Sequence, residues 1–135
     1  MMLYDSLEAC IIHIERKEYA YVAVEGYLVT EKLMNFLDRL VFLCTKKTVK
    51  KIFFDTSKLS VVNKNDVIWI KEHVFPALSY CNIEKVAFLM PENPFGALAL
   101  KALIIETKHA TMKIFNSMEE AEKWIFKKVE MQQSI

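Results

Sequence analysis

An aspartate at the end of an apolar run is the first place where this sequence could do chemistry. Asp55 closes the run "KIFFD" and is followed by Thr56, Ser57 and Ser60. A carboxylate at the carboxyl end of a central parallel strand lies where open α/β sheets bind ligands, so Asp55 could hold a metal ion or act as a base. It could also accept hydrogen bonds from Thr56, Ser57 and nearby amides, and so shape a turn. We favour the second interpretation, because no second carboxylate stands close by in the sequence.

The histidines and cysteines do not form a metal-binding motif. No histidine has a His or Cys partner at ligand spacing, and no two cysteines form a C-x-x-C pair. Two glycines cannot build a phosphate-binding loop, and there is no G-x-S-x-G elbow. We therefore expect no catalytic residue, no metal and no cofactor. The residues concerned are His13, His73, His109, Cys10, Cys44 and Cys81.

The composition is that of one globular domain. The chain has 135 residues, of which 53% are hydrophobic and 26% charged, enough apolar material for a packed core. The net charge of +1 gives no attraction to nucleic acid or to an anionic membrane. The first ten residues do not form a signal peptide, and no apolar run is long enough to insert in a membrane. We expect a cytoplasmic protein with reduced thiols, a single domain over 1–135 with an ordered core at about 5–128, and a frayed tail at 129–135.

Hydrophobic periodicity predicts strands and helices that alternate after an opening hairpin. This order, ββαβαβαβα, implies an α/β domain with a mixed, mainly parallel five-stranded sheet. The expected strands are 7–15, 18–26, 51–55, 83–90 and 111–115, and the expected helices are 31–44, 67–81, 97–108 and 117–126.

Several residues indicate where the helices begin and how they pack. Thr30 is a plausible N-cap, and Ser117 with Glu120 fits the capping-box pattern. Pro76 falls inside an apolar helical face and must bend or interrupt it, because it cannot donate a hydrogen bond to Glu72. In the last helix, three residues share the face that must cover the sheet: Ala121, Trp124 and Ile125.

Two motifs resemble those of SpoIIAA-like members of the STAS superfamily, which includes anti-sigma-factor antagonists. The chain is most similar to a small stand-alone group from Bacteroidetes-type bacteria. One motif is "D-x-S-x-L", and the other is a terminal "F-x-S-x-E-E-A-x-x-W-[IL]". They fall here on Asp55, Ser57 and Leu59, and on Phe115, Ser117, Glu119, Glu120, Ala121, Trp124 and Ile125. The resemblance covers nearly the whole chain and implies that the helices lie mostly on one side of the sheet.

The resemblance also implies a position for a switch. In anti-sigma-factor antagonists, a serine in a "D-S-S-G" window at the start of a helix is phosphorylated by a partner kinase. That window falls here on residues 63–66, with Lys64 at the phosphoacceptor position. Lysine cannot take part in a serine phosphoswitch. Asn63 or Asn65 would still cap the helix, with Asp66 near its positive end.

These observations favour a non-enzymatic interaction or regulatory module, a bacterial signalling protein that contacts an unidentified protein partner. The candidate contact loop contains Asp55, Thr56, Ser57, Ser60, Asn63 and Lys64. The alternative is a carrier of a small apolar ligand or lipid, suggested by the predicted helix 97–108, which is apolar on more than one side. The second apolar side could instead be a dimer contact.

We also expect a homodimer. Alternation along the strands leaves an aromatic and aliphatic surface on the side of the sheet away from the helices, and large patches of this kind usually mark an interface. The residues predicted for this surface are Ile11, Tyr19, Tyr21 and Phe53.

Overall fold

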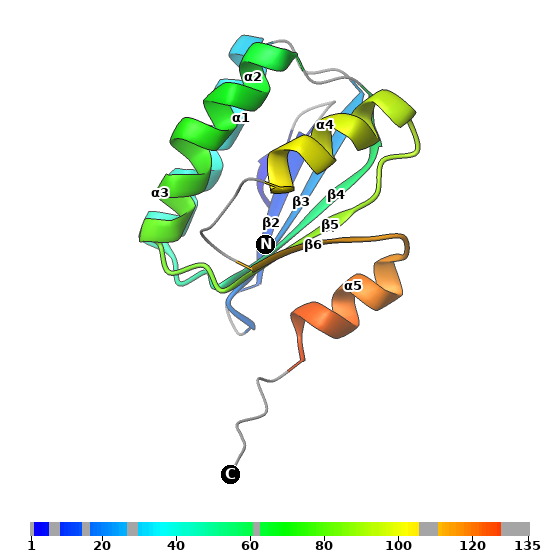
Figure 1. Ribbon diagram of the computed structural model, residues 1–135. Helices are drawn as coiled ribbons and strands as arrows, with labels where there is room; N and C mark the ends of the chain where they lie inside the picture. Colours follow the sequence, from blue (N-terminus) through cyan, green and yellow to red (C-terminus); the bar gives the residue numbers. More distant parts are fainter. Residues whose placement is uncertain are drawn as a thin grey trace.

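The computed structural model describes residues 2–5, 9–14, 17–26, 30–60, 63–105 and 111–127. They form one six-stranded sheet whose strands follow the order of the sequence across it (Figure 1). The first three strands pair antiparallel, and every later neighbour pairs parallel. The strands are β1 (Met2–Asp5), β2 (Ala9–Ile14), β3 (Tyr19–Gly26), β4 (Lys51–Leu59), β5 (Lys85–Leu89) and β6 (Thr111–Phe115).

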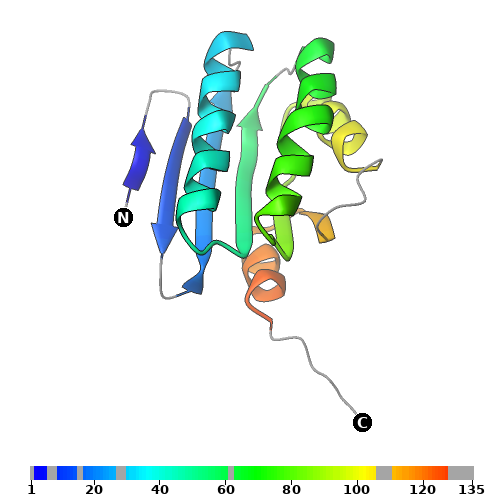
Figure 2. The ribbon, with the colours of Figure 1, turned by 90° about the vertical axis from the view of Figure 1, so that its left-hand side faces the viewer.

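Three helical connections cover one side of this sheet, which we call the helix face. Each connection joins a strand to its immediate neighbour in the same direction across the sheet. Right-handed crossovers must then all fall on one side, and α1 and the α2–α3 rod indeed lie side by side in front of the strands (Figure 2). The connections are α1 (Thr30–Lys46), the continuous rod α2 (Lys64–Trp69), η2 (Ile70–Val74) and α3 (Phe75–Tyr80), and α4 (Pro94–Ile105).

The last helix, α5 (Met118–Ile125), lies on the opposite side, the back face. It follows the final strand and is not a crossover, so handedness does not direct it to the helix face. It packs on β4, β5 and β6 and has its own small core. Ser117 caps it by accepting a hydrogen bond from the Glu120 amide at 3.1 Å, as the capping-box pattern predicts.

The predicted fold class is confirmed. All five expected strands are present in the expected order, and the helices lie mostly on one side. The structure adds one short edge strand, β1, before the predicted hairpin. It also extends β4 four residues beyond Asp55, to Leu59, which places Asp55, Thr56 and Ser57 inside a strand and not in the predicted loop.

Pro76 is accommodated without a break in its helix. The turn before it, Ile70–Val74, is π-helical, and the Phe75 amide donates to the Ile70 carbonyl, five residues back. Proline has no amide hydrogen and its ring crowds the preceding turn. Widening the turn before Pro76 lets the rod continue to Tyr80.

Candidate functional site

The Asp55 carboxylate lies on the back face and is fully engaged by its neighbours. Its Oδ2 accepts a hydrogen bond from the Tyr21 hydroxyl at 2.8 Å. Its Oδ1 accepts from the Ser57 hydroxyl at 2.7 Å and from the Ser57 amide at 3.2 Å. Burial, followed by the hydrogen bond to Asp55, raises the pKa of Tyr21. Three donors on one carboxylate make it a local structural anchor. The sequence interpretation holds for Ser57 but is wrong for Thr56, which donates elsewhere, and for the turn, because Asp55 lies inside β4.

Thr56 points the other way, toward the helix face, and its hydroxyl donates to the Leu89 carbonyl on β5. The pairing of β3 with β4 is irregular here, since Ala23 faces Asp55 but Glu25 faces Lys58. Such a bulge places one extra residue on β4 and re-aims the side chains beside it. Because successive side chains of a strand alternate, Asp55 and Thr56 lie on opposite sides of the sheet and do not form one site.

The loops after β4 and β5 meet at the carboxyl edge of the parallel strands. The Glu92 amide donates to the Ser57 carbonyl at 2.9 Å. Gly96, near the start of α4, lies so close to β4 that an added Cβ would stand 2.7 Å from the Leu59 carbonyl oxygen and 2.8 Å from that of Ser60. Glycine is thus required at this contact, and the end of β4 is fixed against α4.

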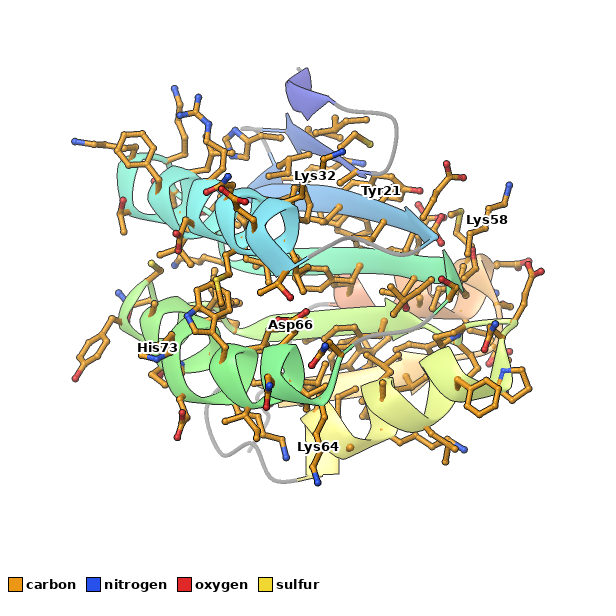
Figure 3. The ribbon with its side chains drawn as sticks, turned by 90° about the horizontal axis from the view of Figure 1, so that it is seen from above. Tyr21, Lys32, Lys58, Lys64, Asp66 and His73 are labelled. Carbon is orange, nitrogen blue, oxygen red and sulfur yellow. The ribbon has the colours of Figure 1, made fainter. Side chains whose placement is uncertain are left out.

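The start of α2 is the most accessible part of the predicted contact loop. Asn63 is the N-cap, and its side chain accepts a hydrogen bond from the Asn65 amide at 2.8 Å. Lys64, the first helical residue, is exposed and points outward at this edge (Figure 3). Residues 61 and 62, between Ser60 and this cap, lie outside the described part of the chain.

Asp66 is a buried carboxylate, although the sequence indicated only that it lies near the positive end of the helix. It is 1% exposed, and its Oδ2 accepts a hydrogen bond from the Thr30 hydroxyl at 3.2 Å. Its Oδ1 has no hydrogen-bond partner among the residues that the structure describes. The bond joins the first residue of α1 to α2, and Figure 3 shows Asp66 between the two helices. The sequence does contain an indication of this burial. Asp66 precedes the buried Ile70 and Val74 by four and eight residues, which places it on the same face of the rod.

An apolar cavity of about 80 Å³ lies between the sheet and the helices of the helix face. The residues that line it are buried, so the cavity lies within the main core. The described lining residues come from β3, β4, β5, α1, the α2–α3 rod and α4. At ~24 cal/mol per Å³, an unfilled space of this size costs about 2 kcal/mol.

Cys44 and Cys81 border one surface groove between the ends of α1 and α3. All three cysteines are free thiols. Burial raises the pKa of Cys44 to about 12, and burial also raises the pKa of Cys81. A thiol with a raised pKa is a poor nucleophile at neutral pH.

Metal binding finds no support among the described residues, where no three His, Cys, Asp or Glu side chains are gathered as a metal site requires. His13 is buried on β2, and His73 is exposed on η2 with its ring 5.8 Å from that of Trp69. His109 lies outside the described residues. No described helix has the length and apolar character needed to cross a membrane.

The surface predicted for a dimer is largely covered. Ile11 belongs to the core under the helix face, because it pairs with Val22 and not with a residue of the back face. Tyr19 and Phe53 do lie on the back face, but they are 5% and 0% exposed beneath α5. Only Tyr21 is part-exposed. The sequence did not indicate that α5 would cross to this side.

Part of the back face stays open, away from α5. Ile12 pairs with Tyr21 and Ile14 with Tyr19, so the side chains of these pairs share a side of the sheet. Ile14 is 37% exposed, and Ile12 and Tyr21 are partly so. Cys10 and Ala23, also paired and partly exposed, extend this open back face, which consists of Cys10, Ile12, Ile14, Tyr21 and Ala23.

The fold is that of SpoIIAA-like proteins, as the sequence motifs predicted. The anti-sigma factor antagonist SpoIIAA, in its unphosphorylated form, superposes with a TM-score of 0.62 at 12% identity, over 85% of this chain and 94% of that one. An uncharacterised DUF3478-family protein from Shewanella loihica PV-4, with a SpoIIAA-like fold, gives 0.62 at 17% identity, over 91% and 98%.

A serine-to-glutamate variant of RsbS from Moorella thermoacetica gives a TM-score of 0.58 at 16% identity, over 85% of this chain and 92% of that one. At such identities the likeness concerns the fold alone. No protein-family model and no curated protein matches the sequence.

Proposed function

We propose that this chain is a non-enzymatic regulatory module that binds a protein partner through the carboxyl edge of its sheet, around the start of α2. The observation that carries the proposal is the exposed Lys64 on a capped helix start, in a fold shared with an anti-sigma factor antagonist. The resemblance assigns the phosphoacceptor serine to this position. With lysine there, we infer a contact that phosphorylation of this residue does not regulate.

The hydrogen bonds at this edge support a binding role and not catalysis. Asp55 has its oxygens engaged by Tyr21 and Ser57, and Thr56 donates to a backbone carbonyl. Both side chains thus hold neighbouring strands together. The three free thiols fit a reducing compartment, and we infer a cytoplasmic, bacterial signalling role from them and from the resemblance.

A charge reversal at Lys64 tests the proposed surface. The wild-type protein and Lys64→Glu are each used to capture partners from native lysate, and any captured protein is then purified and its affinity measured by calorimetry. Lys46→Glu, at the far end of α1, is the matched control. We expect Lys64→Glu to weaken a captured partner at least tenfold while Lys46→Glu retains it. Equal affinity of both variants for every partner found would contradict the proposed surface.

We also propose that the open back face binds a second copy of the chain. The supporting observation is the partly exposed apolar set around Ile12 and Ile14, next to the unpaired edge of β1. Tyr21→Glu is unsuitable as a test, because it would set a new carboxylate against Asp55. Ile14→Glu avoids this problem, and Ile68→Glu, exposed on α2, is the matched control.

Sedimentation equilibrium at micromolar concentration gives the result. We expect the wild-type protein and Ile68→Glu to sediment at twice 15.8 kDa, and Ile14→Glu to sediment at 15.8 kDa. A wild-type mass of 15.8 kDa at every concentration would exclude the dimer.

A further inference from the structure

The cavity under the helix face has walls suited to an apolar occupant. Thr56 is the one polar residue among the described residues that line it, and its hydroxyl already donates to the Leu89 carbonyl. A buried water needs about 2–4 polar partners, whereas cavities lined by Leu, Ile and Phe stay dry. The lining residues are Val24, Leu33, Phe36, Leu37, Phe54, Thr56, Leu59, Ile70, Val74, Phe75, Phe88, Leu100 and Leu103.

The π-helical turn forms one wall of this cavity. Ile70 and Val74, the first and last residues of η2, both line it, and so does Phe75, whose amide closes the wide turn. Pro76 accounts for the wide turn, because its missing amide hydrogen and its ring both disfavour an ordinary turn closed on Glu72. π-Helical turns are found frequently at functional sites, and this one places its two apolar ends toward the empty space.

The volume limits the size of the occupant. The cavity measures about 80 Å³, roughly half of the ~150 Å³ engineered cavity that takes up benzene or xenon. By this comparison, a xenon atom or a hydrocarbon of about three carbons suits the space, whereas the body of a lipid does not.

We infer that this cavity is a binding site for a small apolar molecule of the hydrocarbon class, lined by β3, β4, β5, α1, the α2–α3 rod and α4. The inference rests on the core of the domain and is independent of the proposed contact at Lys64. Failure of one therefore leaves the other standing.

Xenon is the probe. Methyl NMR spectra of the full chain are recorded with and without several bar of dissolved xenon. We expect saturable shifts confined to methyl groups that line the cavity, those of Val24, Ile70, Val74 and Leu103 above all. No saturable shift at these methyls, or contacts between them and water protons, would overturn the inference.

A pair of double variants makes the test specific. Val24→Ile with Val74→Ile adds two methylene groups inside the cavity. Val22→Ile with Val86→Ile adds the same two groups to the same core, at 0% exposed residues that do not line the cavity. We expect the first variant to lose the xenon response and to melt at a higher temperature than the wild type.

The second variant should keep the xenon response and melt at a lower temperature, because overfilling a packed core is destabilising. Val22→Ile alone replaces it if the double variant does not fold. A xenon response that survives in the Val24→Ile, Val74→Ile variant would place the binding elsewhere and overturn the assignment.

Discussion

The Tyr21 hydroxyl donates a hydrogen bond to Asp55 Oδ2 at 2.8 Å and so joins β3 to β4 across the back face. A carboxylate at this place in an α/β sheet suggested chemistry. Its hydrogen bonds instead connect two strands. Oδ2 accepts from Tyr21, and Oδ1 accepts from the Ser57 hydroxyl.

Removing this hydroxyl should destabilise the domain. Tyr21→Phe deletes one hydrogen bond to a carboxylate, which is worth about 1.5–3 kcal/mol in the free energy of unfolding. Tyr19→Phe is the matched control, two residues along the same strand and face. Urea denaturation measures both, and the first variant should lose clearly more stability than the second. Equal losses would show that the Asp55 bond contributes nothing.

A second prediction concerns the bond between the starts of α1 and α2. Thr30→Val removes the donor to the buried Asp66, whose other oxygen is already without a partner. Leaving a buried carboxylate unsatisfied should lower the free energy of unfolding by about 1.5–3 kcal/mol. Thr30→Ser keeps the hydroxyl and should stay close to the wild type. The prediction is wrong if the two variants melt together.

The order of elements could be predicted because each depends on local pattern. Alternation along 18–26, helical spacing along 31–44 and the Ser117 capping box all specify their own segment, and consecutive right-handed crossovers then fix one helix face. No local sequence pattern decides on which face of the sheet α5 packs. It depends on long-range packing of Ala121 and Ile125 against Phe53 and Ala87.

The candidate site was harder to predict for the same reason. Asp55, Thr56 and Ser57 are adjacent in sequence, but they lie within β4, where successive side chains point to opposite sides of the sheet. Thr30 and Asp66 are 36 residues apart and meet only in the folded chain. Pattern reasoning identifies which residues are polar, and the fold decides which of them share a hydrogen bond.

A third prediction is loss of stability at alkaline pH. Burial raises the pKa of Cys44 from 9.0 to about 12, and burial also raises the pKa of Tyr19 and Tyr21. The stabilisation from Cys44 is complete below pH 9, where the thiol is protonated in both states. Above pH 9 the unfolded chain loses this proton first, so stability falls up to pH 12 by at most about 1.4 kcal/mol per pH unit for this group.

Urea denaturation at a series of pH values from 7 upward measures this dependence. Cys44→Ala removes the thiol and should give a shallower decline, although the variant starts from a lower stability at pH 7. The same slope in both proteins above pH 9 would mean that Cys44 does not contribute to the alkaline loss.

The last prediction compares two neighbours on α5. Sequence spacing placed Trp124 inward with Ala121 and Ile125, but only Ala121 and Ile125 are fully buried. Trp124 is half-buried, its ring 5.5 Å from that of Phe115, with the amino groups of Lys85 and Lys113 over it at 5.1 and 5.3 Å. Because truncation costs most where no water can enter, Ile125→Ala should lose about 2–5 kcal/mol. Trp124→Ala should lose less than the ~3–5 kcal/mol of a fully buried aromatic. Thermal unfolding that ranks Trp124→Ala well below Ile125→Ala in stability would show that the tryptophan, and not the isoleucine, anchors α5 to the sheet.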